Sequence, residues 1–116
     1  MVPSTAHNIA HHLSSWALAA PDRTAVLAPV RPAGHWGPVR WQGWTFAQLN
    51  RACDGYAHLL EGLGIGRGTL TLLMVRPGLD FYALTYGLFK LGAVPVLIDP
   101  GMGWRNFVEC VRQSAP

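Results

Sequence analysis

The clearest pattern in the chain is an apolar stripe over residues 45–63, with apolar positions spaced alternately by three and four. The stripe consists of Phe46, Leu49, Cys53, Tyr56, Leu60 and Leu63. This spacing places the side chains on one face of a helix. Thr45 and Gln48 have the spacing of a capping box at its start, and Gly62 and Gly64 are expected to end it. The pattern therefore predicts an amphipathic helix that buries one face.

Two segments further along, 69–75 and 94–98, are almost wholly apolar, which is typical of strands covered on both faces. Between them, residues 79–91 carry an apolar stripe of helical spacing. Strand–helix–strand units of this kind are right-handed and give parallel strands. The apolar run 81–98 is as long as a membrane span, but Lys90 at its centre would be costly in a bilayer. We interpret the run as a helix followed by a buried strand.

Shorter elements complete the pattern. A first helix is expected after Thr5 as N-cap and before Pro21, with Ile9, Leu13, Trp16 and Ala20 on one face. Segments 24–28 and 39–44 are predicted to form an antiparallel strand pair, separated by a loop rich in proline and glycine. Residues 103–114 predict a last helix.

This order of elements predicts the α/β class: a short antiparallel strand pair plus a βαβ parallel sheet with covering helices. The strand at 94–98 is expected to leave an open apolar edge, which natural proteins pair or cover. Half of the residues are apolar and only 13% are charged, against about 25% in an average domain. We therefore expect the chain to bury surface against other polypeptide, as the beginning of a larger domain.

Composition excludes several classes of protein. The net charge is +3 and the sequence pI about 9.3, but the basic residues are scattered, so the footprint of a nucleic-acid binder is missing. The apolar content excludes disorder, and two cysteines are too few for a disulfide scaffold. No lysine or arginine precedes Arg23, so the apolar stretch 13–20 lacks the basic start of a signal peptide. We expect a cytoplasmic protein.

Several candidate sites are better explained as structure. Gly64, Gly66 and Gly68 follow a helix and open a strand, the reverse of a phosphate-binding loop, so a turn is expected. The histidines include a pair one helical turn apart but no third ligand, which favours an exposed helix face over a metal site. They are His7, His11, His12, His35 and His58.

The cysteines and tryptophans also have plain interpretations. Cys53 and Cys110 have no neighbouring base, so buried structural thiols are expected rather than nucleophiles. An aromatic and basic group in the hairpin region suits either stacking on a ring or, as we favour, a loop anchored over the core. It consists of Arg31, Trp36, Arg40, Trp41 and Trp44.

The more informative candidates are Arg76-Pro77 and Asp99-Pro100, at the carboxyl ends of the two expected parallel strands. Ligands of open α/β sheets bind at these ends, and an arginine binds a phosphate or carboxylate through two hydrogen bonds. The favoured alternative is that Arg76 and Asp99 cap neighbouring turns or pair with each other. We assign no catalytic, cofactor-binding or metal-binding residue.

Two segments resemble core motifs of the adenylate-forming, AMP-dependent synthetase and ligase superfamily. Trp44–Asn50 (WTFAQLN) resembles the first motif, and Phe89–Pro100 (FKLGAVPVLIDP) the second and more specific one. Ala20–Val26 and Gly64–Gly68 match the same family in order and spacing.

A finer resemblance lies in the two strand ends. They are similar to the acyl-activating branch, and in particular to the β-lactone synthetases of olefin biosynthesis; the segments are Met74–Gly78 and Ile98–Gly101.

The resemblance implies that a fatty or β-hydroxy acid is activated by ATP and Mg²⁺ to an acyl-adenylate, with release of pyrophosphate. The acyl group then passes to coenzyme A or is captured by the substrate's own β-hydroxyl. The family's phosphate loop, nucleotide contacts, magnesium glutamate and C-terminal lysine lie beyond the segment that this sequence matches. Residues 1–116 are therefore expected to be a partial N-terminal subdomain, inactive alone, whose partner is the remainder of the domain.

Two other interpretations remain open. A non-catalytic α/β interaction module would use the open sheet edge to bind a partner protein. A free-standing nucleotide binder would need a phosphate turn after a strand, for which Arg76–Gly78 is the one candidate in the sequence.

Overall fold

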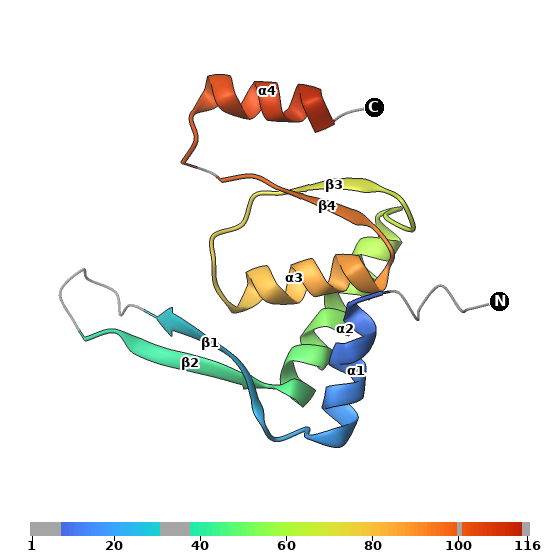
Figure 1. Cartoon of the computed structure of the whole chain (residues 1–116), viewed down its shortest axis with the longest axis vertical. Coiled ribbons are helices and arrows are strands. Elements are labelled where there is room, and N and C mark those ends of the chain that lie inside the picture. The colour runs from blue at the N-terminus through green and yellow to red at the C-terminus, as the bar shows by residue number, and fades with distance from the viewer. Residues whose placement is uncertain (1–7, 31–37, 100, 115–116) are drawn as a thin grey trace.

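The computed structural model describes residues 8–30, 38–99 and 101–114. Its elements in chain order are α1 (Ala10–Ala19), β1 (Thr24–Val30), β2 (Arg40–Thr45), α2 (Phe46–Gly62), β3 (Leu70–Leu73), α3 (Leu79–Lys90), β4 (Val94–Leu97) and α4 (Trp104–Ser114). In Figure 1, α1, α2 and α3 form one packed group, β1 and β2 extend to one side, and β3 and β4 lie between α3 and α4. The predicted α/β class is confirmed.

Helix α2 begins at the predicted capping box. The Thr45 hydroxyl accepts a hydrogen bond from the Gln48 backbone N–H at 3.2 Å, and the Gln48 side-chain oxygen accepts one from the Thr45 N–H at 2.9 Å. The helix ends at Gly62, and Gly64 adopts φ +91°, a left-handed conformation that favours glycine. Both ends of the helix are therefore set by local sequence.

Helix α1 begins later than expected, at Ala10. The expected N-cap, Thr5, lies outside the described residues. The residue at the N-cap position is Ile9, which makes no side-chain cap, and the Asn8 side-chain oxygen accepts a hydrogen bond from the Ala10 N–H at 2.9 Å. Of the expected stripe, Leu13 is buried whereas Trp16 is about half exposed, so α1 buries a narrow face.

Strands β1 and β2 pair antiparallel, as predicted. Val26 lies opposite Trp44 and Leu27 opposite Gly43. A Cβ atom at position 43 would lie 2.7 Å from the Leu27 Cδ2, so the glycine makes room for that side chain. The far end of the hairpin extends away from the helices (Figure 1).

Strands β3 and β4 pair in parallel and are joined through α3, which confirms the predicted βαβ unit. Leu73, Leu88 and Ala93 form a buried cluster between this sheet and α3. A second cluster joins α1, α2 and α3; it consists of Leu13, Leu49, Cys53 and Ala83. The core of the molecule therefore follows α3, which takes part in both clusters.

The expectation that β3 and β4 are covered on both faces is wrong. Leu70, Leu72 and Val94 are 44–45% exposed, whereas Leu73 is 7% exposed. Leu73 faces α3, and because side chains alternate along a strand, Leu70 and Leu72 face the other way. Helix α4 lies on that side (Figure 1) but buries none of its own residues. One face of the sheet is packed and the other is mostly open.

The apolar run 81–98 forms most of α3 and all of β4, as interpreted from the position of Lys90. Within the part of the chain that the structure describes, no helix has the length and apolar character needed to cross a membrane.

Candidate functional site

The carboxyl ends of β3 and β4 carry the candidate residues Arg76 and Asp99. The Asp99 carboxylate accepts a hydrogen bond from the Gly101 N–H at 2.8 Å, and its carbonyl accepts one from Met102 at 3.2 Å. Asp99 therefore caps its own turn, as the favoured alternative predicted. Pro100 lies outside the described residues.

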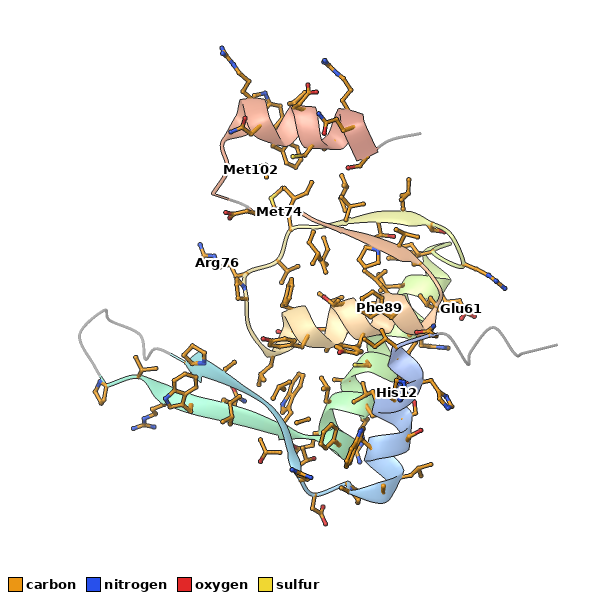
Figure 2. All side chains as sticks on the ribbon, in the orientation of Figure 1. His12, Glu61, Met74, Arg76, Phe89 and Met102 are labelled. Carbon is orange, nitrogen blue, oxygen red and sulfur yellow. The ribbon has the colours of Figure 1, made fainter. Side chains whose placement is uncertain are left out.

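Arg76 is exposed, and its side chain extends away from the ribbon in Figure 2. The ion pairs among residues 8–30, 38–99 and 101–114 are Lys90–Asp54 and Arg112–Glu109. Arg76 and Asp99 therefore do not pair, and of the two possibilities in the favoured alternative Asp99 follows the capping one. Arg76 is a solvent-facing cation after β3, with the chemistry to meet an anion.

The three glycines at residues 64–68 form a turn, as predicted. Their N–H groups already have protein acceptors: Gly64 donates to the Glu61 carbonyl, Gly66 to the Thr69 hydroxyl and Gly68 to the Gly92 carbonyl. Backbone donors bonded within the protein cannot cradle a phosphate. The turn is a connection between α2 and β3.

The histidines give no metal site in the described part of the chain, where no three metal-ligating side chains gather. His11 and His12 lie exposed on α1 with their rings 6.3 Å apart, edge to face. His58 is exposed on α2, and His7 and His35 lie outside the described residues. The exposed helix face expected for His11 is confirmed.

Cys53 is fully buried in the core, as predicted. Burial raises the pKa of its thiol from 9.0 to about 11, and nearby Lys90 lowers that pKa by less. The nucleophilic form of a cysteine is the deprotonated thiolate, and Cys53 stays protonated near neutral pH. Cys53 is therefore inert as a nucleophile there. Cys110 is half-buried on α4, with its sulfur 3.8 Å from the sulfur of Met102.

The tryptophans of the hairpin region separate in the structure. Trp44 packs against the cluster around Leu49, which fits an aromatic anchor over the core. Trp41 lies on β2 with most of its surface exposed. Trp36 and Arg31 lie outside the described residues. The anchored-loop interpretation is therefore right for Trp44 and wrong for Trp41.

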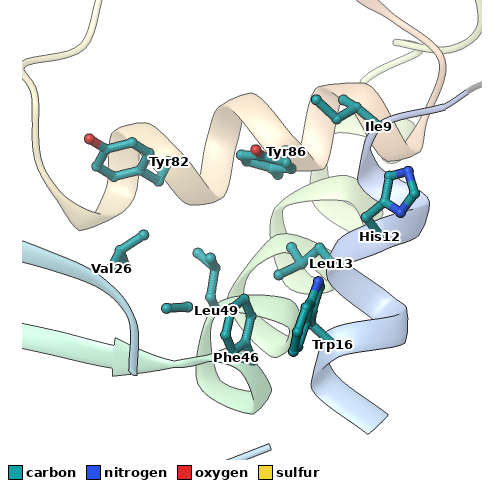
Figure 3. Close-up of a pocket in the computed structure, with 10 residues that line it drawn as sticks. Ile9, His12, Leu13, Trp16, Val26, Phe46, Leu49, Tyr82 and Tyr86 are labelled. Carbon is teal, nitrogen blue, oxygen red and sulfur yellow. The ribbon is translucent and has the colours of Figure 1, made fainter. Parts of the chain in front are cut away.

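An apolar groove of about 260 Å³ lies between α1, β1, α2 and α3 (Figure 3). Trp16 and Phe46 stack along one wall with ring centroids 5.6 Å apart, and Tyr82 and Tyr86 line another. The Arg23 guanidinium lies 5.9 Å from the centre of the Trp16 ring, a cation–π arrangement. Sequence analysis missed this groove; the signal was the pair of tyrosines one turn apart on α3, off its main stripe.

A polar junction joins α2 and α3, and it too was missed. The Lys90 ammonium donates to the side-chain oxygens of Asn50 and Asp54, each at 2.5 Å. Close by, the Asn8 amide donates to the Phe89 carbonyl at 2.5 Å. Lys90 thus joins α3 to α2, and Asn8 joins the segment just before α1 to the end of α3, so the lysine of the second motif has a structural role.

The described residues do not fit a nucleotide or a magnesium ion. The glycine N–H groups of the turn are already bonded within the protein, and among the described residues no cluster of metal ligands occurs and no ion pair includes Arg76. His12, Tyr82 and Tyr86 line the groove, but no hydrogen bond among the described residues pairs His12 with either tyrosine as general base and acid. The geometry describes a scaffold.

Comparison with known proteins relates this scaffold to larger enzymes. Residues 13–116 match the profile of the family described as AMP-binding enzyme. An olefin beta-lactone synthetase from Stenotrophomonas maltophilia is 41% identical to this chain over 110 residues. A second protein of that name, from Xanthomonas campestris, is 36% identical over 113 residues. The alignments cover 94% and 97% of this chain but 20% of each relative.

Solved structures agree with this match. A fatty acyl CoA synthetase from Mycobacterium tuberculosis superposes with a TM-score of 0.78 and 25% identity, over 97% of this chain and 20% of that one. The N-terminal subdomain of NpsA from Klebsiella oxytoca, in complex with anthranilyl-AMSN, superposes with a TM-score of 0.78 and 19% identity, over 92% and 25%. The chain thus spans about a fifth of its curated relatives, and it belongs to the AMP-binding enzyme family.

Proposed function

We propose that this chain is the N-terminal portion of an ATP-dependent ligase that activates a fatty or β-hydroxy carboxylic acid. The observation that carries the proposal is the 41% and 36% identity to two olefin beta-lactone synthetases over almost the whole chain. A protein named long-chain-fatty-acid–CoA ligase FadD13 is 40% identical over 55 residues, which supports the same substrate class. In this proposal residues 1–116 form part of the N-terminal subdomain.

The proposed reaction begins with attack of a substrate carboxylate oxygen on the α-phosphorus of ATP. The bond from that phosphorus to the bridging oxygen breaks, pyrophosphate leaves, and a mixed anhydride, the acyl-adenylate, is formed. The substrate's β-hydroxyl then attacks the acyl carbon, or the thiol of coenzyme A does so, with loss of AMP and a proton. The proposal includes a cytoplasmic location, where ATP and coenzyme A are available.

This chain contributes architecture to that reaction. The first motif supplies the capping box that starts α2. The second motif supplies the strand β4 and also Lys90, whose side chain contacts α2. Phosphate and magnesium contacts would be made by other segments of the domain, since the described residues offer no such site. We therefore propose that residues 1–116 do not activate acids by themselves.

A non-catalytic interaction module is the second candidate. The observation that favours it is the open apolar face of the β3–β4 sheet, with Leu70, Leu72 and Val94 each 44–45% exposed. Such a surface is more often an interface than a free surface. In this case the face would bind a separate protein that has no part in acid activation.

The two candidates differ in an exchange assay. Incorporation of labelled pyrophosphate into ATP would be measured with β-hydroxy fatty acids for three proteins: this chain, a chimera that continues it with the remainder of the Stenotrophomonas relative, and that remainder alone. We expect exchange by the chimera only. A folded chimera that supports no exchange with any acid would favour the module, and exchange by residues 1–116 alone would contradict their proposed inactivity.

A further inference from the structure

The arginines and the lysine of this chain lie in different surroundings. The sequence has eight arginines and one lysine, Lys90. Every arginine among the described residues is exposed, from Arg23 before β1 to Arg112 on α4. The Lys90 side chain, in contrast, is 15% exposed. The described surface therefore carries its positive charge on guanidinium groups, and the one amine side chain of the sequence is turned inward.

Two hydrogen bonds hold the Lys90 ammonium in place. Its Nζ atom donates to the side-chain oxygens of Asn50 and Asp54, each at 2.5 Å. An ammonium has three N–H donors and no lone pair, so in this arrangement Nζ is not a nucleophile. An amide nitrogen at the same place would keep one N–H and could serve only one of the two acceptors. Acylation of Lys90 would therefore break at least one bond between α2 and α3.

The space beside Lys90 is small. A hollow of about 150 Å³ borders the side chain and is lined also by Asn8, Ala10, His11 and Ser14. The Asn8 amide bonds the Phe89 carbonyl at 2.5 Å and so holds the segment before α1 against the end of α3. Pockets that enclose small ligands have volumes of about 300–1,000 Å³. An acyl-adenylate is therefore too large to reach the amine through this hollow.

The acyl-adenylate of the proposed reaction is a mixed anhydride, and it acylates free amines without a catalyst. The lone pair of a neutral amine attacks the acyl carbon, and a C–N bond forms. The bond from that carbon to the phosphate oxygen breaks, AMP leaves with the electron pair, and the amine gives a proton to water. The resulting amide is stabilised by its partial double bond. A guanidinium is charged and delocalised, so an exposed arginine does not accept the acyl group as an exposed lysine does.

The buried thiol is protected in the same way as the amine. Cys53 has no exposed surface, and burial raises the pKa of its thiol to about 11. Cys110 is half-buried, with its sulfur 3.8 Å from that of Met102. An acyl group on a sulfur atom is a thioester, which hydroxylamine removes, whereas an amide resists hydroxylamine. Permanent modification of side chains by an acyl-adenylate is therefore a question of amines.

We infer that this part of the protein is resistant to acylation by the acyl-adenylate, because its exposed cations are guanidinium groups and its one lysine is shielded at the junction of α2 and α3. The shielding itself is a property of the fold. Its role, protection of the enzyme from its own activated intermediate, rests on the proposed function, since that reaction forms the adenylate.

An exposed amine in the same molecule provides the comparison. Arg105 lies exposed on α4, and Arg105→Lys keeps its charge while adding an amine. This variant of the full 116-residue chain would be incubated with synthetic octanoyl-adenylate and treated with hydroxylamine, and the amides at both positions would be followed by peptide mass spectrometry. We expect acylation of Lys90 to be slower than that of position 105 by about tenfold or more. Equal rates would overturn the inferred shielding.

Unfolding shows whether the fold causes the difference. In urea we expect the two amines to react at rates within about twofold of each other. The wild type needs no substitution for the same comparison: acylation of Lys90 should be about tenfold or more faster in urea than in the folded chain. A folded rate equal to the rate in urea would overturn the inference, and this comparison decides if the Arg105→Lys variant fails to fold.

A matched pair of carboxylates tests the junction. Asp54→Ala removes one acceptor of the Lys90 ammonium and should raise the acylation rate of Lys90 by about threefold or more. Glu109→Ala removes an exposed carboxylate paired with Arg112 on α4 and should leave that rate within about twofold. An equal effect of both substitutions, or none of either, would show that the junction is not what shields the amine.

The chimera separates the shielding from the proposed function. A chimera with both Arg51→Lys and Arg105→Lys would be given a β-hydroxy fatty acid, ATP and Mg²⁺. We expect amides to accumulate at these two exposed positions while Lys90 stays free. Absence of pyrophosphate exchange would contradict acid activation and not the result with synthetic adenylate. Exchange without amide at either position would show that the adenylate does not reach this surface, and would overturn the protective role.

Discussion

The Lys90 ammonium lies 2.5 Å from the Asp54 carboxylate and joins the last turn of α3 to the middle of α2. The same ammonium donates to Asn50, which belongs to the first of the two family-like motifs, whereas Lys90 belongs to the second. Two segments separated by 40 positions are thus in direct contact. The Lys90 side chain is 15% exposed and that of Asp54 is 61% exposed, so the pair lies at the rim of the core.

We expect the two partners to differ in their contribution to stability. Lys90→Ala removes buried aliphatic packing and leaves Asn50 without its donor, which costs about 1–2 kcal/mol of unfolding free energy. Asp54→Ala removes an exposed acceptor and costs about 0.5 kcal/mol. Urea unfolding of both variants and the double variant measures their coupling, which should decrease with added salt. Glu109→Ala, in the exposed pair with Arg112, is the control and should be near neutral; an equal cost for Lys90→Ala and Asp54→Ala would contradict this account.

The capping box of α2 provides a second prediction. Thr45→Ala removes the acceptor of the Gln48 N–H and should lower the unfolding free energy by about 1 kcal/mol. Thr45→Ser keeps the hydroxyl oxygen and should retain most of the stability. Urea unfolding followed by circular dichroism compares the three proteins. A cost for the serine variant as large as for the alanine variant would show that the threonine methyl group, and not the cap, matters.

The sequence was informative wherever a local interaction decides the structure. The start of α2 follows from Thr45 and Gln48, which are three positions apart, and the parallel pairing of β3 and β4 follows from the length of α3. Burial of Cys53 follows from its place on the apolar stripe. In each case the determining groups lie within one element or one connection, so spacing alone carries the information.

The failures concern contacts that depend on distant parts of the chain. Spacing could not decide whether Arg76 and Asp99 cap turns or pair; in the structure Asp99 caps its own turn and the two do not pair. Lys90 binds residues 36 and 40 positions away, which no periodicity indicates. The sheet face that carries Leu72 was expected to be covered, but it is open. The apolar composition of a strand indicates that the strand is suited to burial, but it does not indicate which polypeptide covers it. Covering polypeptide is a property of the whole domain.

Two helical glycines should respond oppositely to the same substitution. A Cβ atom at Gly87 would lie 3.1 Å from the Cys53 carbonyl oxygen and 3.4 Å from the Ala57 nitrogen, both in the α2 backbone, which cannot move aside easily. Gly87→Ala should therefore push α2 and α3 apart and cost about 1–3 kcal/mol. At Gly55 a Cβ atom meets nothing within 4 Å, so Gly55→Ala should stabilise by up to about 1 kcal/mol. Thermal unfolding of both variants measures this, and stabilisation by Gly87→Ala would show that the helices do not cross so closely.

The buried Cys53 thiol predicts a loss of stability in alkali. Burial raises the pKa of this thiol from 9.0 to about 11, so between these values the unfolded chain loses its proton while the folded chain keeps it. The stabilising contribution is complete below pH 9 and decreases as the pH rises toward 11. Urea unfolding from pH 8 to pH 11 should show this decrease in the wild type and a flatter profile in Cys53→Ala, which is less stable throughout because of its cavity. The hydrogen bond to Asp80 raises the pKa of Tyr56 above 10.0 and adds a decrease of the same sign, so Tyr56→Phe is the matched control. A profile for Cys53→Ala as steep as that of the wild type would show that Cys53 does not stay protonated in the fold.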